Sequence, residues 1–119
     1  MDHVENDLGR EPTREEVGRL KGLAVLEFGA SWCPICQGTA PAIAAFLRRY
    51  PNVSHIKDED GRGRPLGRSF GVKLWPTLIF LHDGRIVTQI VRPDENELRH
   101  GFETLADDDP KASAQTDSP

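Results

Sequence analysis

The sequence predicts an α/β domain in which a mixed sheet of four to five strands has helices on both faces. Three observations support this prediction. Short apolar runs alternate along the chain with segments of helical hydrophobic period. The first strand-helix-strand unit requires a crossover connection, so its two strands should be parallel. Farther along, Asp83-Gly84 is a strong hairpin signal, so the last two strands should be antiparallel.

The length and composition exclude several classes of protein. A chain of 119 residues can bury enough surface for one domain without a disulfide. Its net charge of -4 argues against a general nucleic-acid-binding protein, which would present a basic surface. The longest apolar runs have about five residues, whereas a membrane helix needs roughly 20. Residues 1–10 are polar and lack a signal-peptide core, so we expect a cytoplasmic protein that does not act on membranes.

The N-terminal part of the chain predicts a flexible lead and a short helix. Residues 1–11 show no clear hydrophobic period and should form the lead. Thr13 and Glu16 then match the capping box, in which each side chain bonds to the other residue's backbone N–H. The helix is expected over residues 13–20, at the start of a domain spanning residues 12–106.

A buried strand and a longer helix come next. Residues 23–28 form a compact apolar run, which predicts the strand. From residue 33 to residue 50 the apolar side chains recur at helical spacing. This helical face contains Cys36, Ala40, Ile43, Ala44 and Leu47. Pro41 lies inside the predicted helix and should kink it.

The second half of the domain predicts three strands and a short helix. Residues 52–57 alternate weakly in polarity and predict the first of these strands, and the polar, glycine-rich segment 58–67 should be a loop. A short helix is possible over residues 65–70. Residues 77–81 and 85–91 flank the Asp-Gly turn and should form the hairpin.

The chain should end with a helix and a tail. Asp94 and Glu97 form a second capping box and predict the start of the helix. Its core-facing residues should be Leu98, Phe102 and Leu105. Residues 107–119 are acidic and small and include no large apolar residue, so we expect a disordered tail.

The chemistry of this chain is expected at Cys33 and Cys36, where the first strand leads into its helix. Pro34 suits the first helical position, which makes Cys33 the N-cap. The Cys33 sulfur should then face the free N–H groups of Ile35 and Cys36, which together with the helix dipole favour a thiolate. Cys36 lies one turn farther on, on the buried face. We therefore expect Cys33 to be the exposed, attacking thiol and Cys36 the shielded, resolving thiol.

Two other interpretations of the cysteine pair are weaker. A zinc site usually takes four ligands, and this chain lacks a second cysteine pair. The four histidines are scattered, at His3, His55, His82 and His100. Inert core thiols would not require an adjacent Trp32 or a helix-starting proline. The context therefore favours redox chemistry.

The residues around the cysteines resemble the thioredoxin family. Trp32-Cys33-Pro34-Ile35-Cys36 is similar to the Trp-Cys-x-x-Cys site of that family. A helix-kinking proline follows the second cysteine at the spacing that thioredoxins use. The resemblance covers residues 13–106 and implies the thioredoxin fold.

A second motif carries the same resemblance. Trp75-Pro76-Thr77, with the apolar run and the Asp-Gly turn that follow, is similar to the cis-proline segment and hairpin of thioredoxins. The resemblance implies that Pro76 is cis, lies beside the cysteines, positions the substrate backbone and keeps metal ions away from the thiols.

The resemblance also implies the function of a protein-disulfide oxidoreductase. Cys33 would attack a substrate disulfide, Cys36 would resolve the mixed disulfide, and a separate reductase would recycle the oxidised protein. The expected partners are disulfide-containing proteins and that reductase, and the chain should be a monomer. No bound cofactor or metal is expected beyond the redox-active Cys33–Cys36 disulfide.

The chain departs from the thioredoxin pattern at several positions. Pro34-Ile35 stands where thioredoxins commonly have Gly-Pro, and this dipeptide tunes the reduction potential, so reductant and oxidant both remain open. Gly29 replaces a tryptophan that family members often carry. Arg92 takes the place of a glycine after the last strand. It either adds positive charge beside the Cys33 site or is an ordinary solvated arginine, and both alternatives remain open.

Glu27 stands where thioredoxins have a buried aspartate, six residues before the first cysteine. It could be an edge-strand carboxylate that faces water. Alternatively, it is a buried general base that takes the proton from Cys36, with a pKa raised by burial. Lys57 or His55 on the neighbouring strand would then be its partner.

Five residues are candidates for substrate binding: Trp32, Pro34, Trp75, Pro76 and Arg92. Trp32 is expected to pack on the surface first and to contact substrate second. The Trp75 side chain could equally belong to the core. Three nearby arginines, Arg62, Arg64 and Arg68, are expected to form a solvated loop, and a role in holding an acidic partner is the weaker alternative.

Two other functions remain open at this point. The chain could be a thioredoxin-like binding module or chaperone in which the cysteines are incidental. It could also be a dimer that holds a metal or an iron–sulfur cluster through two cysteine pairs.

Overall fold

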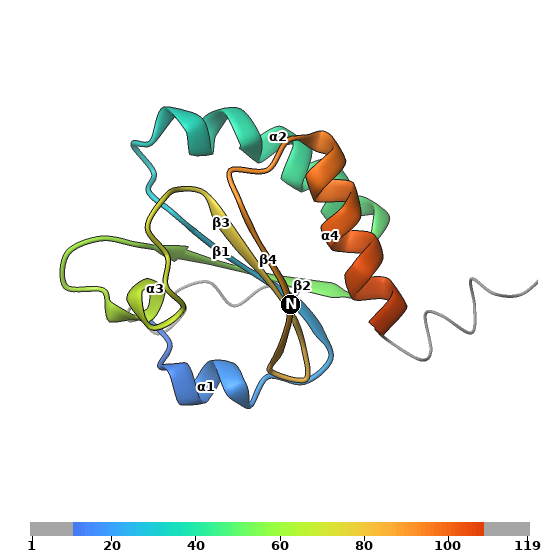
Figure 1. Cartoon of the computed structure of the whole chain (residues 1–119), viewed down its shortest axis with the longest axis horizontal. Coiled ribbons are helices and arrows are strands. Elements are labelled where there is room, and N and C mark those ends of the chain that lie inside the picture. The colour runs from blue at the N-terminus through green and yellow to red at the C-terminus, as the bar shows by residue number, and fades with distance from the viewer. Residues whose placement is uncertain (1–10, 109–119) are drawn as a thin grey trace, which may run out of the picture.

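The structure, a computed structural model, describes residues 11–108 (Figure 1). Most of the predicted N-terminal lead, residues 1–10, and the tail from residue 109 onward lie outside the described residues. The elements in chain order are α1 (Arg14–Gly18), β1 (Leu23–Gly29), α2 (Pro34–Arg49), β2 (Val53–Glu59), α3 (Pro65–Ser69), β3 (Thr77–His82), β4 (Arg85–Val91) and α4 (Glu95–Asp108).

The four strands form a mixed sheet in the order β2-β1-β3-β4. β1 pairs parallel with β2 and antiparallel with β3, and β3 pairs antiparallel with β4. The parallel pair follows from the crossover through α2, and the last antiparallel pair from the turn at Asp83-Gly84. The predicted mixed α/β sheet is therefore confirmed.

Helices cover both faces of the sheet, as predicted (Figure 1). On one face, α2 and α4 pack on the strands through a cluster that includes Phe46, Phe80 and Phe102. The Phe102 ring stacks on Phe46 and meets Phe80 edge-to-face. On the other face, α1 and α3 contribute Val17 and Leu66 to a second cluster. Because β1 lies between the two clusters, its seven residues are all buried.

Local sequence signals account for the helix starts. Thr13 and Glu16 form the predicted capping box at α1. At α4 the Asp94 N–H donates to Glu97 Oε1 at 2.9 Å, and the Glu97 N–H donates to Asp94 Oδ1 at 2.8 Å. These reciprocal bonds satisfy backbone donors that a helix start otherwise leaves unpaired.

The C-terminal helix continues past the predicted domain end. α4 includes Asp107 and Asp108, which the sequence assigned to the tail. Asp108 Oδ2 accepts from His82 Nδ1 at 2.8 Å and from an Arg85 guanidinium N–H at 2.6 Å. These contacts with the β3–β4 hairpin order the last turn.

The segment after β2 also differs from the prediction. β2 extends to Glu59, and Asp58 on it is buried. Arg62 and Arg68 are exposed, as expected of a solvated loop. The prediction is wrong for Arg64, whose guanidinium bonds to Asp58 Oδ1 at 3.1 Å and to the Glu59 carbonyl at 2.6 Å. The cause is a buried carboxylate that needs a cation.

Glu11 joins this buried group of charges. Its Oε1 accepts from the Leu66 N–H at 3.0 Å, and its Oε2 lies 3.7 Å from Arg64 Nε. Burial, and then a hydrogen bond with the Glu11 carboxyl group, raise the pKa of Asp58 to about 7, and the Arg64 charge only partly opposes this shift. Below about pH 7 the Asp58 carboxyl group therefore holds a proton in the folded chain.

The proton on Asp58 should make the free energy of unfolding depend on pH. The pKa of Asp58 is about 7 in the folded chain and about 4 in an unfolded one, so between these values the folded state binds the extra proton. The free energy of unfolding should then fall by at least about 1 kcal/mol as the pH rises from about 4 to about 7. Asp58→Asn should flatten this fall in urea unfolding curves measured across that range. Glu15→Gln, at an exposed acid of α1, is the control, and equal slopes for the two variants would contradict the assignment.

Candidate active site

The two cysteines lie where β1 gives way to α2. Cys33 is the N-cap of α2 and Pro34 its first residue, as the sequence predicts. The Cys33 sulfur accepts a hydrogen bond from the Cys36 N–H, with a donor–acceptor distance of 3.3 Å. Both cysteines are free thiols. The start of the helix thus places backbone donors around one sulfur and puts the second cysteine one turn farther on.

The exposure expected for Cys33 is not observed. Cys33 is 6% exposed and Cys36 is 8% exposed, so both are buried. They pack in a small cluster with Ala30, and Trp75 packs against that cluster from the side. The prediction was wrong because the sequence did not show that Trp75, distant along the chain, packs against this cluster.

Electrostatics, rather than exposure, distinguishes the two thiols. The pKa of Cys33 is lowered, first by a hydrogen bond from the Cys36 side chain, while burial opposes the shift. The backbone N–H groups of Cys36 and Ile35 and the positive charge of Arg92 also lower the pKa of Cys33. Burial, and then the hydrogen bond with Cys33, raise the pKa of Cys36 to about 11. The arrangement therefore favours ionisation of Cys33 before Cys36, with the Cys36 thiol as a hydrogen-bond donor to the Cys33 sulfur.

Glu27 is a buried carboxylate in the centre of the sheet. It is 3% exposed and lies on β1, which has a strand on each side, so the edge-strand alternative is excluded. Its Oε1 lies 2.7 Å from His55 Nε2. Lys57 is its backbone neighbour on β2, but His55 is the side chain that contacts it. The negative charge of Glu27 contributes to the raised pKa of Cys36, which places the carboxylate within electrostatic reach of that thiol.

Gly29 provides room for the Cys36 sulfur. A Cβ atom at this position would lie 2.8 Å from Cys36 Sγ, closer than such atoms approach in proteins. A larger residue at this position would require the Cys36 sulfur to shift.

The segment after β2 adds two residues that the sequence did not point to. The Glu59 carboxylate accepts from the Ser31 N–H at 3.1 and 3.2 Å, just before Trp32. Asp60 Oδ2 accepts from the indole Nε1 of Trp75 at 2.8 Å. Both are acidic residues in a predicted loop, and no sequence signal distinguishes them from solvated acids.

The candidate substrate-binding residues gather around the cysteines. Trp32 is 68% exposed and meets the half-buried Trp75 edge-to-face, with ring centroids 5.4 Å apart. Pro34 is exposed, whereas Pro76 is buried. The Trp75–Pro76 bond is cis, as the resemblance implies. Ile35, Leu74 and Val91 are large apolar residues that also remain exposed.

Arg92 lies at the corner between β4 and α4. It has a positive φ of 47°, which side chains other than glycine rarely adopt. Its N–H donates to the Pro76 carbonyl at 2.8 Å, and its Nε donates to the Trp75 carbonyl at 2.8 Å. These contacts bind the corner to the cis-proline segment and hold the charge near Cys33.

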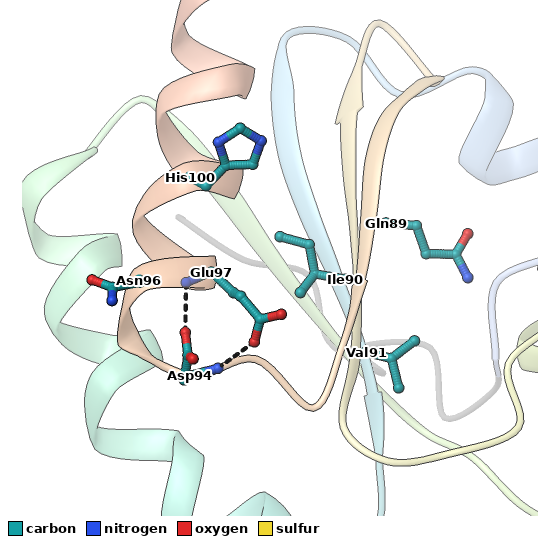
Figure 2. Close-up of a pocket in the computed structure, with 7 residues that line it drawn as sticks. All are labelled: Gln89, Ile90, Val91, Asp94, Asn96, Glu97 and His100. Carbon is teal, nitrogen blue, oxygen red and sulfur yellow. Dashed lines mark hydrogen bonds between the residues drawn. The ribbon is translucent and has the colours of Figure 1, made fainter.

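A surface hollow between β4 and the start of α4 is separate from the cysteines. Its lining residues are Gln89, Ile90, Val91, Asp94, Asn96, Glu97 and His100. Figure 2 shows that Asp94 and Glu97 bond to each other's backbone, so the capping box already engages both carboxylates. The hollow offers no reactive group beyond His100.

Within residues 11–108, no group of three or more His, Cys, Asp or Glu side chains is placed to hold a metal ion. In the same range, no helix combines the length and apolar character needed to cross a membrane.

Comparison with known proteins finds similarity to thioredoxins at the level of family, sequence and structure. The sequence profile of the Thioredoxin family matches residues 8–104. The H-type thioredoxin of Ricinus communis is 34% identical over 79 residues, which are 66% of this chain and 67% of the relative. Thioredoxin H5 of Arabidopsis thaliana is 30% identical over 84 residues, 71% of each chain. The structure of thioredoxin 2 from Pseudomonas aeruginosa in its reduced form is 50% identical, covers 81% of this chain and 90% of that chain, and has a TM-score of 0.74.

The hydrogen bond between the two thiols can be tested by substitution. Because the Cys36 side chain is the largest cause of the lowered Cys33 pKa, Cys36→Ala should raise that pKa. Cys36→Ser keeps a donor at the same place and should raise it less. Alkylation of Cys33 by iodoacetamide, followed across pH, gives both values. Cys33 titrations that are unchanged from wild type in both variants would show that the Cys36 side chain does not contribute to the lowered pKa.

Proposed function

This chain belongs to the thioredoxin family and is a thiol–disulfide oxidoreductase, and we propose that it works as a reductant of disulfides in proteins. The observation that carries the exchange chemistry is the position of Cys33 at the N-cap of α2, where its sulfur accepts from the Cys36 N–H at 3.3 Å and the two cysteine pKa values shift in opposite directions. A lowered pKa increases the thiolate fraction of Cys33, and a raised one keeps Cys36 protonated until it is needed. The similarity to thioredoxins supports the reducing direction.

The proposed reaction proceeds in two exchange steps. The Cys33 thiolate attacks one sulfur of the substrate disulfide, forms a mixed disulfide and releases the other sulfur as a thiolate. Cys36 then loses its proton and attacks Cys33 Sγ, which forms the Cys33–Cys36 disulfide and releases the second substrate sulfur. The substrate gains the two electrons that the dithiol loses. A separate reductase returns the pair to the dithiol.

We assign the removal of the Cys36 proton to Glu27. With a pKa of about 11, Cys36 needs a base at neutral pH. Glu27 is a buried carboxylate whose charge acts on Cys36, and its contact with His55 provides a route for the proton toward the surface because His55 is only half-buried. This role belongs to the resolving step and leaves the first attack to Cys33.

The proposed location is the cytoplasm, where reductases keep dithiols reduced. A reductant of protein disulfides needs a continuous supply of electrons, and that compartment provides one. We propose that the chain acts there as a monomer, with disulfide-containing proteins and its reductase as partners. Its substrates would dock on the apolar residues that remain exposed around Cys33, led by Trp32.

Reduction of insulin disulfides in the presence of dithiothreitol tests the function directly. Wild-type protein should give turnover, and the Cys33→Ser variant should give none. A folded protein without turnover would favour the binding-module alternative. A redox titration of the Cys33–Cys36 pair then separates a reductant, with a potential near that of thioredoxins at about -270 mV, from an oxidant with a potential nearer -120 mV.

Glu27→Gln should slow the second step and spare the first. A general base typically contributes about a hundredfold or more to a proton-transfer step, so the mixed disulfide should accumulate in quenched reactions with a peptide disulfide. Alkylation of Cys33 should be nearly unchanged, because Glu27 is not among the causes of the Cys33 pKa shift. Glu59→Gln removes a carboxylate that contacts Ser31 and serves as the control. Normal resolution in the Glu27 variant would exclude the carboxylate as the base.

Arg92→Gly should destabilise the thiolate form of Cys33 without lowering the thermal stability of the protein. Glycine tolerates the positive φ at this corner, so the thermal midpoint should hold or rise. Loss of the charge should raise the Cys33 pKa modestly and slow reduction of acidic peptide disulfides, more at low salt than at high salt. Arg19→Gln, an exposed arginine just after α1, is the matched control. An unchanged titration with unchanged low-salt rates would exclude a role for the charge.

A further inference from the structure

Trp75 packs against the cluster that contains the attacking thiol. Cys33 caps a helix near exposed apolar residues and near the positive charge of Arg92, yet only 6% of it is exposed. The half-buried indole of Trp75 packs on the cluster that contains Cys33 and Cys36. The other tryptophan, Trp32, meets Trp75 edge-to-face and is itself open to solvent. Trp75 is therefore a side chain that borders the cysteine pair and contacts the exposed Trp32.

A single carboxylate fixes the position of this indole. Trp75 Nε1 donates to Asp60 Oδ2 at 2.8 Å. Among residues 11–108, no lysine or arginine forms an ion pair with Asp60, so its charge is available to the indole N–H. A hydrogen bond to a charged acceptor is stronger than one between neutral groups.

Asp60 is in turn held firmly. Its backbone N–H donates to the Gly29 carbonyl at 2.8 Å, which continues the pairing of β1 and β2 by one residue. On the side of α3, its carboxylate lies against Gly67, where a Cβ atom would approach Asp60 Oδ1 to 2.5 Å. The absence of a side chain at Gly67 thus leaves room for Asp60 to point at Trp75.

The backbone of Trp75 is anchored separately from its ring. Its carbonyl accepts from Arg92 Nε, and the next residue is bonded through its carbonyl to the Arg92 N–H. The ring can consequently change its rotamer while the main chain stays in place. The bond to Asp60, the packing on the cysteine cluster and the edge-to-face contact with Trp32 oppose that change.

We propose that Trp75 is a cover over the Cys33 sulfur and that Asp60 is the positioning residue that holds the cover closed. The pair limits access to Cys33, so that small or extended disulfides react readily and disulfides in bulky, folded surroundings react slowly. The proposal rests on Cys33 being the attacking thiol and not on the direction of the redox reaction.

Alkylation of Cys33 in a Cys36→Ser background provides the test, with the rate followed across pH. Asp60→Ala and Trp75→Phe each remove the indole hydrogen bond, the second while keeping a ring. Each should raise the plateau rate above the Cys33 pKa by about fivefold, the change in open population expected when one hydrogen bond is lost. The gain should be larger for a bulky maleimide than for iodoacetamide. Asp60→Asn keeps an oxygen acceptor and should restore most of the wild-type rate.

Two further measurements keep the result unambiguous. If both residues act through one bond, the double variant Asp60→Ala/Trp75→Phe should be no faster than either single variant. The protein has two tryptophans, so in a Trp32→Phe background the emission reports Trp75 alone and should shift to longer wavelength with Asp60→Ala. Circular dichroism confirms the fold, and Arg62→Gln, at an exposed residue of the same loop, controls for loop disturbance.

The outcomes are distinct. If Asp60→Ala shifts the pH midpoint of Cys33 alkylation but leaves the plateau rate unchanged, Asp60 acts only through its charge, and the proposal is overturned. Plateau rates equal to wild type in a folded Asp60→Ala protein would also overturn it. Faster alkylation in the Asp60→Ala variant, combined with no insulin turnover by the wild-type protein, would support the role of Trp75 as a cover and reject the proposed reductant function.

Discussion

The central place of β1 in the sheet is the constraint on which the site depends. It pairs with β2 on one side and β3 on the other, and helices bury both of its faces. The end of β1 therefore fixes the position of Cys33, which follows it in the chain. The cis-proline segment that precedes β3 lies on one side of this strand end, and the segment that follows β2 lies on the other. Glu27 is buried for the same reason, because a carboxylate on a central strand has no route to water of its own. The residues that carry the thiol chemistry are thus positioned by a strand that cannot move without disrupting the core.

Local signals made most of the fold predictable. Both capping boxes, the proline at the start of α2 and the Asp-Gly turn act over three or four residues, and each produced the expected element. The parallel pairing of β1 and β2 followed from chain connectivity. The N-cap position of Cys33 was predictable in the same way, because the sequence alone sets which N–H groups lie free at a helix start.

Contacts between distant segments were not predictable. Arg64 resembled a solvated loop residue until the fold placed Asp58 and Glu11 beside it. Cys33 was expected to be exposed, and 42 residues along the chain Trp75 supplies the ring that packs beside it. Asp60 and Glu59 showed no pattern in the sequence, since their partners, Trp75 and Ser31, are brought to them by the sheet. These residues differ from ordinary surface charges only in their tertiary surroundings.

Because Cys33 is the N-cap of α2, the bonding at the start of this helix depends on the redox state of the cysteines. In the dithiol the Cys33 sulfur accepts a hydrogen bond from the Cys36 N–H at 3.3 Å. In the disulfide that sulfur is bonded to the Cys36 sulfur, and a neutral sulfur is a weaker acceptor than a thiolate. The first turn of α2, a helix that also forms the core with α4, is thus joined by a hydrogen bond in one state and by a covalent link in the other. Amide exchange at the Cys36 N–H should therefore differ between the two states, although the covalent link keeps the turn in place.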